Sequence, residues 1–196
     1  MFQPWLPLLH PAQTRQKVVI AGSGPAGMVA ALELARHGVA SVVLTAELQF
    51  SQGSRAIVFT RRSMEILQQV GTADRMTANG LPWRFGNSFY RGQRVFRMEA
   101  PHDHDDRFFP LLNIQQQYME EYLFDACAAN PLIDFRWGNK LEQVTQRDGF
   151  AELRVDTPEG EYTLQTDWLV DATGGRSAIR TISSPAPTPS TPAAMR

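Results

Sequence analysis

Three glycines near the start of the chain have a spacing that could bind a phosphate group. They lie in the sequence GSGPAG at positions 22–27 and form a GxGxxG pattern. Glycine lets the backbone come close to a pyrophosphate, and a helix that begins at such a loop offers free N–H groups and a partial positive charge. The pattern therefore predicts a site for the diphosphate of a dinucleotide. Its candidate contacts are Gly22, Ser23, Gly24, Pro25, Ala26 and Gly27.

Regular elements on both sides must hold this loop in place. Four apolar residues, Val18–Ala21, predict a buried parallel strand before it. A helix is predicted after it, because Pro25 suits the first helical position and Gly38 suits the left-handed residue after a helix end. A second apolar strand at 41–46 completes a β-α-β unit. This context makes the glycine pattern informative, and the alternative is an ordinary glycine-rich turn that binds no ligand.

The rest of the chain carries further helix and strand patterns. Apolar residues recur at helical spacing in some stretches and alternate with polar residues in others. Turn residues separate the strands, among them the pair Arg91 and Gly92. The predicted elements are helices at 60–70 and 118–127, hairpin strands at 85–90 and 95–98, a three-stranded antiparallel meander over 140–165, and a buried strand at 168–170.

Composition and charge exclude several classes of function. The 196 residues carry a net charge of −1, with 43% hydrophobic and 20% charged residues, so we expect a globular protein that binds neither nucleic acid nor a membrane. The single cysteine, Cys127, is typical of a reducing cytoplasm, and its helical surroundings favour a core residue over a catalytic thiol. His102, His104 and the neighbouring aspartates lack the spacing of a metal site, so they predict a solvated loop and no metal.

Three longer stretches carry a family resemblance. They are GSGPAGMVAALELARHG, GSRAIVFTRRSMEILQQVG and LLNIQQQYMEEYL, in this order. Together they resemble the FAD domain of the aromatic-ring flavoprotein monooxygenases, the p-hydroxybenzoate hydroxylase-like family, over residues 17–180. The first resembles the FAD motif, the second the segment that begins with a pyrophosphate-facing arginine, and the third the helix whose glutamine reaches the cofactor. The resemblance implies that Arg55 and Gln116 contact FAD, with Gln115 as the less favoured register.

Two positions depart from the family pattern. The family closes its second strand with an acidic residue that accepts hydrogen bonds from the ribose, whereas this strand ends in Thr45 and the nearest acid is Glu47. A slightly longer strand would bring Glu47 to the ribose. Near the end of the chain, DATGGRS places Thr173 where the family has an aspartate. This stretch resembles the Ala-Thr-Gly version of other flavoproteins, in which the backbone passes close to the cofactor, and Gly174 keeps that role better than Thr173.

The resemblance implies an α/β fold. It would be a Rossmann-like FAD/NAD(P)-binding domain with a parallel sheet, an antiparallel three-stranded meander as a crossover and a partial substrate-domain hairpin. The expected divisions are an N-terminal extension over 1–16, an FAD-binding domain over 17–182 with a partial substrate-domain insertion at 80–112, and a disordered tail over 183–196. Because family members continue well beyond this length, we expect a truncated chain that is not catalytically complete alone.

In the complete enzyme, the resemblance implies that NAD(P)H reduces FAD and that dioxygen then hydroxylates a small phenolic substrate. No catalytic residue can be assigned from this half. We expect a cytoplasmic protein that self-associates through the hairpin at 85–98 where nothing packs on it. Two alternatives stay open. One is a non-catalytic FAD or dinucleotide module that acts with a partner chain, and the other is a simple NAD-dependent reductase, which the predicted meander disfavours.

Overall fold

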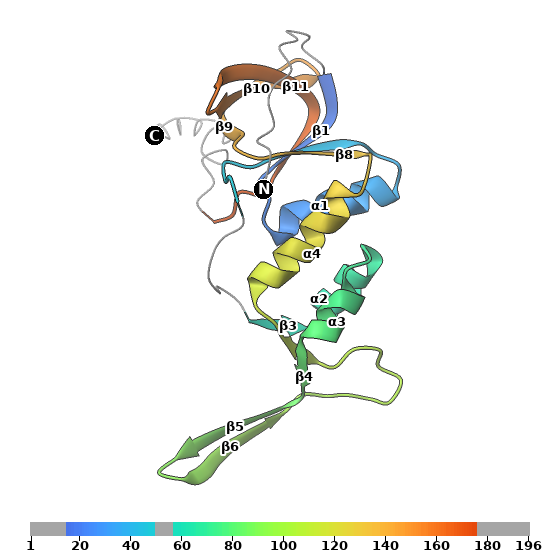
Figure 1. The fold of residues 1–196 in the computed structure, drawn as a ribbon, viewed down its shortest axis with the longest axis vertical. Helices are drawn as coiled ribbons and strands as arrows, with labels where there is room; N and C mark the ends of the chain where they lie inside the picture. The colour runs from blue at the N-terminus through green and yellow to red at the C-terminus, as the bar shows by residue number, and fades with distance from the viewer. Residues whose placement is uncertain (1–14, 50–56, 176–196) are drawn as a thin grey trace, which may run out of the picture.

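The computed structural model describes residues 15–49 and 57–175, and its largest sheet has six strands (Figure 1). In sheet order the strands are β8 (Ile133–Arg136), β2 (Ser41–Leu44), β1 (Arg15–Ala21), β11 (Gly160–Asp171), β10 (Phe150–Thr157) and β9 (Lys140–Arg147). The first four run parallel, while β9, β10 and β11 form the predicted antiparallel meander. The predicted α/β fold is therefore confirmed.

Strand β11 takes part in both halves of this sheet. Its residues from Gly160 to Thr166 pair antiparallel with β10, and its residues from Gln165 to Asp171 pair parallel with β1. The sequence predicted two separate strands here, and that division is wrong. No glycine or proline interrupts the sequence between Glu161 and Asp171, so one extended strand continues from the first partner to the second.

The two faces of the parallel strands contribute to two different cores. Val18 and Ile20 point toward the helices α1 (Pro25–Arg36) and α4 (Gln116–Ala128), which pack side by side against the sheet (Figure 1). Val19, between them, points to the other face and packs with the meander residues Leu153 and Val155. Successive side chains of a strand point to opposite faces, so a strand covered on both sides is apolar throughout. This explains the unbroken apolar run before the glycine loop.

The helix predictions are largely confirmed, with different ends. Helix α1 begins at Pro25, and Gly38 adopts the expected left-handed backbone with φ of +71°. Helix α2 (Arg61–Gln69) is followed by a second short helix, α3 (Ala73–Asn79), which the sequence did not predict. Strand β2 ends at Leu44 and not at 46, because the backbone of Thr45 leaves the β1 pairing and bonds to the end of β8 and the segment after it.

A second, smaller sheet lies beyond the helices. It consists of β3 (Val58–Thr60), β7 (Leu111–Asn113) and β4 (Leu81–Trp83), none of which the sequence predicted. The predicted hairpin is confirmed as β5 (Phe85–Tyr90) and β6 (Gln93–Glu99), which project from the end of the molecule opposite the large sheet (Figure 1). Arg91 and Gly92 both have positive φ, as a tight hairpin turn requires.

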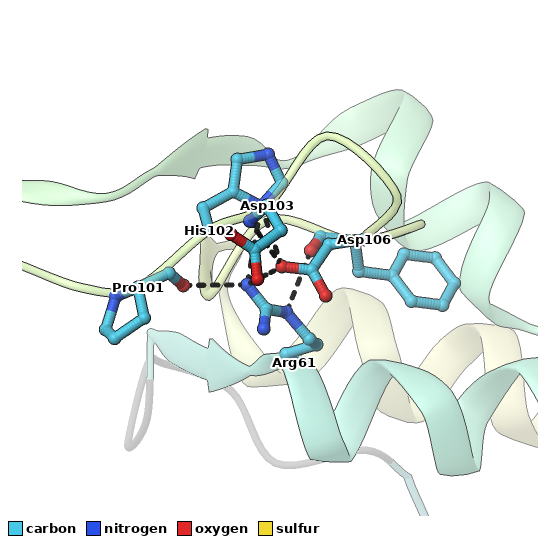
Figure 2. A network of polar contacts seen from close by, with 6 residues as sticks. Arg61, Pro101, His102, Asp103 and Asp106 are labelled. Atoms are coloured by element: carbon cyan, nitrogen blue, oxygen red, sulfur yellow. Dashed lines mark hydrogen bonds and ion pairs between the residues drawn. The ribbon is translucent and has the colours of Figure 1, made fainter.

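The histidine- and aspartate-rich loop between β6 and β7 is fixed to α2 by one arginine. Figure 2 shows the Arg61 guanidinium pointing into this loop, where it donates to the carbonyl of Pro101 at 2.8 Å and pairs with Asp106 at 2.8 Å. Asp106 also accepts from the backbone N–H of Asp103 at 2.8 Å. The prediction of a merely solvated loop is therefore only half right: His104 is exposed, whereas His102 is largely covered.

Three parts of the predicted divisions lie outside the described residues: positions 1–14, the end of the FAD-binding domain at 182 and the tail at 183–196. Strand β1 begins at Arg15, so the last two residues of the predicted extension belong to the sheet. In the part of the chain that the structure describes, no helix has the length and apolar character to cross a bilayer.

Candidate functional site

A cleft of about 700 Å³ opens at the carboxyl ends of the parallel strands. Ligands of open α/β sheets bind at this edge. The glycine loop, the segments after β2, β8 and β11, and the start of α4 supply its walls. The lining residues are Ala21, Gly22, Ser23, Gly24, Pro25, Ala26, Leu44, Thr45, Ala46, Glu47, Gln49, Gln116, Glu120, Trp137, Asn139, Lys140, Leu141, Ala172, Thr173 and Gly174.

The three glycines of the loop differ in the space beside their Cα atoms. A Cβ on Gly22 would lie 2.5 Å from the carbonyl oxygen of Ala172, and a Cβ on Gly27 would lie 2.0 Å from the carbonyl oxygen of Gly22. Those two positions are therefore closed by the protein's own backbone. Gly24 is different, because a Cβ there meets no atom within 4 Å and would enter the cleft. Among the three glycines of the loop, Gly24 is the one that leaves open space beside the described residues.

The loop continues into the N-terminus of α1, which faces the same cleft. Gly24 is the N-cap, and among the described residues no side chain caps this end. The first N–H groups of a helix have no intrahelical partner, and they carry the positive end of the helix dipole. Pro25 has no N–H to offer, so the free donors belong to Ala26 and Gly27. This end of the helix can therefore bind an anion.

The segment after β2 brings Thr45 and Glu47 to the cleft in different states. The Thr45 hydroxyl is buried, and it accepts from the Ser23 hydroxyl at 2.8 Å and from the Glu47 N–H at 3.3 Å. The Glu47 side chain is exposed at the cleft wall. Strand β2 ends at Leu44 and does not extend toward Glu47, as the predicted ribose contact had required. Glu47 instead reaches the cleft from the loop after the strand. Its contact with a ribose stays a prediction.

Helix α4 presents one of its two candidate glutamines to the cleft. Gln116 lines it and is partly buried, whereas Gln115 is exposed and is not among the lining residues. The Gln116 side-chain N–H donates to Glu120 Oε1 at 2.6 Å, and Glu120 is only 6% exposed. The placement agrees with the favoured register. Glu120 itself was missed, although its position four residues after Gln116 puts both on one helix face.

The segment after β11 closes the opposite wall. Thr173 donates from its backbone N–H and from its hydroxyl to Asp171 Oδ1, at 3.0 and 2.6 Å. Gly174 has φ of +89°, a conformation that favours glycine. Both residues line the cleft, as the sequence predicted, while their contact with a cofactor stays a prediction. Arg55, the remaining predicted contact, lies outside the described residues.

Sequence reasoning missed the wall that follows β8. Trp137, Asn139, Lys140 and Leu141 line the cleft, because β8 is the parallel neighbour of β2. Asn139 joins this wall to β2 by donating its backbone N–H to the Thr45 carbonyl at 2.7 Å. The apolar residues Leu132, Ile133 and Phe135, on both sides of Asp134, were the signal that could have predicted β8.

A partly buried tyrosine of the meander supports this wall. The Tyr162 hydroxyl donates to Asn139 Oδ1 at 2.7 Å and accepts from Arg136 at 3.1 Å. Burial raises the pKa of Tyr162 above its usual value, so the phenol remains protonated and can donate. Lys140 turns to Glu142 at 2.6 Å, and that hydrogen bond raises the lysine pKa. The polar groups of this wall thus hold one another.

Comparison with known proteins gives a consistent result. A family model described as "FAD binding domain" matches residues 15–192. Para-nitrophenol 4-monooxygenase of Pseudomonas sp. (strain WBC-3) is 27% identical over 174 residues, which cover 86% of this chain and 42% of that protein. The 3-(3-hydroxy-phenyl)propionate/3-hydroxycinnamic acid hydroxylase 2 of Burkholderia vietnamiensis is 30% identical over 172 residues, which cover 86% of this chain and 31% of that protein.

Solved structures give the same picture. The crystal structure of p-nitrophenol 4-monooxygenase PnpA from Pseudomonas putida DLL-E4 matches with a TM-score of 0.78 and 24% identity, over 85% of this chain and 42% of that one, which shows the fold. The flavin-dependent monooxygenase PieE, solved in complex with FAD and substrate, matches with a TM-score of 0.76 and 28% identity, over 85% and 31%. The chain spans less than half the length of these relatives.

Proposed function

The chain belongs to the family of FAD binding domains, and we propose that its cleft binds FAD with the diphosphate on the loop at 22–27. In that case it is the FAD-binding part of a flavin-dependent aromatic monooxygenase. The carrying observation is the open side of Gly24 at the cleft, where a Cβ would meet no atom of the described residues within 4 Å. Next to it lie the uncapped N–H groups of α1, which suit a diphosphate.

The other cleft residues fit the rest of a dinucleotide. Glu47 offers exposed carboxylate oxygens as acceptors for ribose hydroxyls, and Gln116 offers an amide at the start of α4. The backbone at Thr173 and Gly174 is where the resemblance brings the chain close to the cofactor. Arg55 carries a guanidinium, whose fork of donors suits phosphate oxygens. Bound FAD would supply the redox chemistry, and these residues would bind and orient it.

The reaction of the complete protein is a wider proposal. One relative is named as a 4-monooxygenase of para-nitrophenol, and another as a hydroxylase of 3-(3-hydroxy-phenyl)propionate and 3-hydroxycinnamic acid. We therefore propose a small aromatic substrate, NAD(P)H as the electron donor and dioxygen as the oxidant. The described residues offer no acid–base pair or nucleophile in the cleft that would replace flavin chemistry. The second candidate is a binding module that works with a partner chain, which the exposed hairpin β5–β6 favours.

A titration of the purified chain tests the proposal. FAD should bind at one equivalent, with quenching or enhancement of flavin fluorescence and a shift of its visible absorbance. ADP should compete, since it shares the adenosine and the diphosphate, and NAD should bind more weakly than FAD. A chain that folds and binds neither FAD nor ADP would contradict the proposed function.

A turnover assay tests whether the chain alone can carry out the complete reaction. The FAD-loaded chain, NADPH, oxygen and a panel of phenols should give hydrogen peroxide or no turnover, because hydroxylation needs a ring held next to the flavin away from water. A second polypeptide that contains the rest of the family's sequence should restore hydroxylated product if the chain is part of a monooxygenase. Phenol hydroxylation in step with NADPH consumption by the chain alone would contradict this expectation.

A further inference from the structure

Two side chains of α4 meet at the cleft wall. Gln116 donates its side-chain N–H to Glu120 Oε1 at 2.6 Å, and both residues line the cleft. Residues four apart lie on the same face of a helix, so this contact forms within α4 alone. Glu120 is 6% exposed, which makes it one of the few carboxylates covered by the protein. We expect a covered carboxylate at the cleft wall to have a function.

The chemistry of the pair determines how the amide of Gln116 is oriented. An ionised carboxylate accepts hydrogen bonds and donates none, whereas a glutamine amide has a donor end and an acceptor end. Glu120 therefore takes one of the two hydrogens on Nε2, which fixes the amide plane and leaves Oε1 as the acceptor that Gln116 can offer to a ligand. We propose that Glu120 is a positioning residue for FAD, which presents the Gln116 carbonyl oxygen to a hydroxyl of the cofactor. This inference rests on the proposed function of the cleft.

The electrostatic effect of Glu120 has the opposite sign from its positioning effect. A carboxylate near a diphosphate repels it, so removing the charge alone would tighten FAD binding. Loss of the amide orientation would weaken binding, because a neutral amide in place of the Glu120 carboxylate can either donate to or accept from the amide of Gln116. The substitution Glu120→Gln thus separates the two effects by the direction of the change in Kd.

The chain contains a matched control one residue along the same helix. Gln117 donates to Glu121 at 3.5 Å with the same four-residue spacing, and neither residue lines the cleft. Glu121→Gln makes the same chemical change and alters the net charge equally. Any effect of helix stability or of total charge appears in both variants, and an effect on the Gln116 amide appears only in Glu120→Gln.

The experiment is an FAD titration of the unchanged chain and of the variants Glu120→Gln, Glu121→Gln, Gln116→Ala and the double variant Gln116→Ala/Glu120→Gln. We expect Glu120→Gln to raise Kd about three- to tenfold, the size of one lost hydrogen bond. Glu121→Gln should leave Kd unchanged. In the Gln116→Ala background, Glu120→Gln should leave Kd unchanged or lower it. At saturating FAD, the visible circular dichroism of Glu120→Gln should match that of Gln116→Ala and differ from that of the unchanged chain.

Three outcomes would overturn the role of Glu120: a lower or unchanged Kd in Glu120→Gln, an equal rise in both backgrounds, or a visible circular dichroism equal to that of the unchanged chain. Glu120→Ala removes the acceptor without adding an amide and should raise Kd in the same way, which keeps the test valid where one variant folds poorly. An unchanged chain that binds no FAD contradicts the proposed function itself. Binding that none of the Glu120 substitutions weakens contradicts only this inference.

Discussion

The hydroxyl of Ser23 donates to the hydroxyl of Thr45 at 2.8 Å and ties the glycine loop to the end of β2. Thr45 also accepts from the backbone N–H of Glu47 at 3.3 Å. One buried oxygen thus sets the distance between the loop at 22–27 and the segment that carries Glu47. The two walls of the cleft are joined by side-chain chemistry as well as by the sheet.

Replacement of Thr45 by valine should loosen this connection. Valine has nearly the same shape but no acceptor, so the Ser23 hydroxyl and the Glu47 N–H each lose a partner. We expect the free energy of unfolding in urea to fall by about 1 to 2 kcal/mol. Thr45→Ser retains the hydroxyl and should lower it by less. A Thr45→Val variant as stable as the unchanged chain, with the loss confined to Thr45→Ser, would assign the stability to packing of the threonine methyl group.

Replacement of Glu47 by glutamine tests the predicted ribose contact. If the carboxylate accepts from ribose hydroxyls, the substitution should weaken FAD binding by about 1 to 3 kcal/mol, the range for a hydrogen bond to a charged group. Glu159→Gln, in the exposed turn between β10 and β11, is the control for the change in charge. Fluorescence titration gives both values. Tighter binding in Glu47→Gln would show that the carboxylate only repels the diphosphate.

The glycine loop should respond differently at its second and third glycines. Gly24→Val places a side chain in the open cleft, so it should abolish FAD binding and leave the melting temperature nearly unchanged. Gly27→Ala brings a Cβ to 2.0 Å from the Gly22 carbonyl oxygen, so it should destabilise the fold by about 3 kcal/mol or more. Calorimetry and FAD titration separate the two effects. Full FAD affinity in Gly24→Val would refute the assignment of this loop.

Arg61 should control the order of the loop at 101–107. Arg61→Ala removes the donor to Pro101 and the partner of Asp106, so the backbone N–H of Asp103 should exchange with solvent at least about tenfold faster. Arg62→Ala is the matched control, because Arg62 pairs with Glu65 on the exposed face of α2. Hydrogen exchange read by mass spectrometry distinguishes the variants. Similar exchange in both would mean that the loop holds itself.

Cys127 should be unreactive until the protein unfolds. Burial raises the pKa of this thiol to about 12, so the nucleophilic thiolate is nearly absent at pH 8. Its contribution to stability is full below the unfolded pKa of about 9 and is lost as the pH rises through 12. A disulfide reagent at pH 8 should label the native chain slowly and the urea-unfolded chain at once. Rapid labelling of the native chain would contradict this.

The parts of the fold that the sequence predicted are those that short stretches specify. The β1–loop–α1 unit was found because strand, glycines and helix follow one another within one stretch, and the hairpin because its turn residues lie between its strands. Strand β11 was divided wrongly, since its change of partner from β10 to β1 depends on a strand far away in the chain. The loop around Asp106 was misread for the same reason: its anchor, Arg61, lies on another element.

The candidate site follows the same division. The loop glycines, Gln116 and Gly174 carry motifs and were placed at the cleft from the sequence. Glu120 was missed although it lies within a quoted motif, because its value depends on the hydrogen bond to Gln116. Asn139 was missed because only the order of strands in the sheet brings the end of β8 next to the end of β2. A single sequence contains no pattern that shows which parallel strands are neighbours in the sheet.

The central position of β11 has a consequence for synthesis of the chain. Strand β1 is made about 150 residues before β11, which is one of its two neighbours in the sheet. Until Asp171 has emerged, β1 has an unpaired edge in a nascent chain that already contains α1, β2 and the exposed hairpin. Such an edge can pair with a neighbouring nascent chain on the same messenger. The large sheet is therefore completed only after β11 has been made, and a ribosome-bound chaperone would protect the open edge of β1 until then.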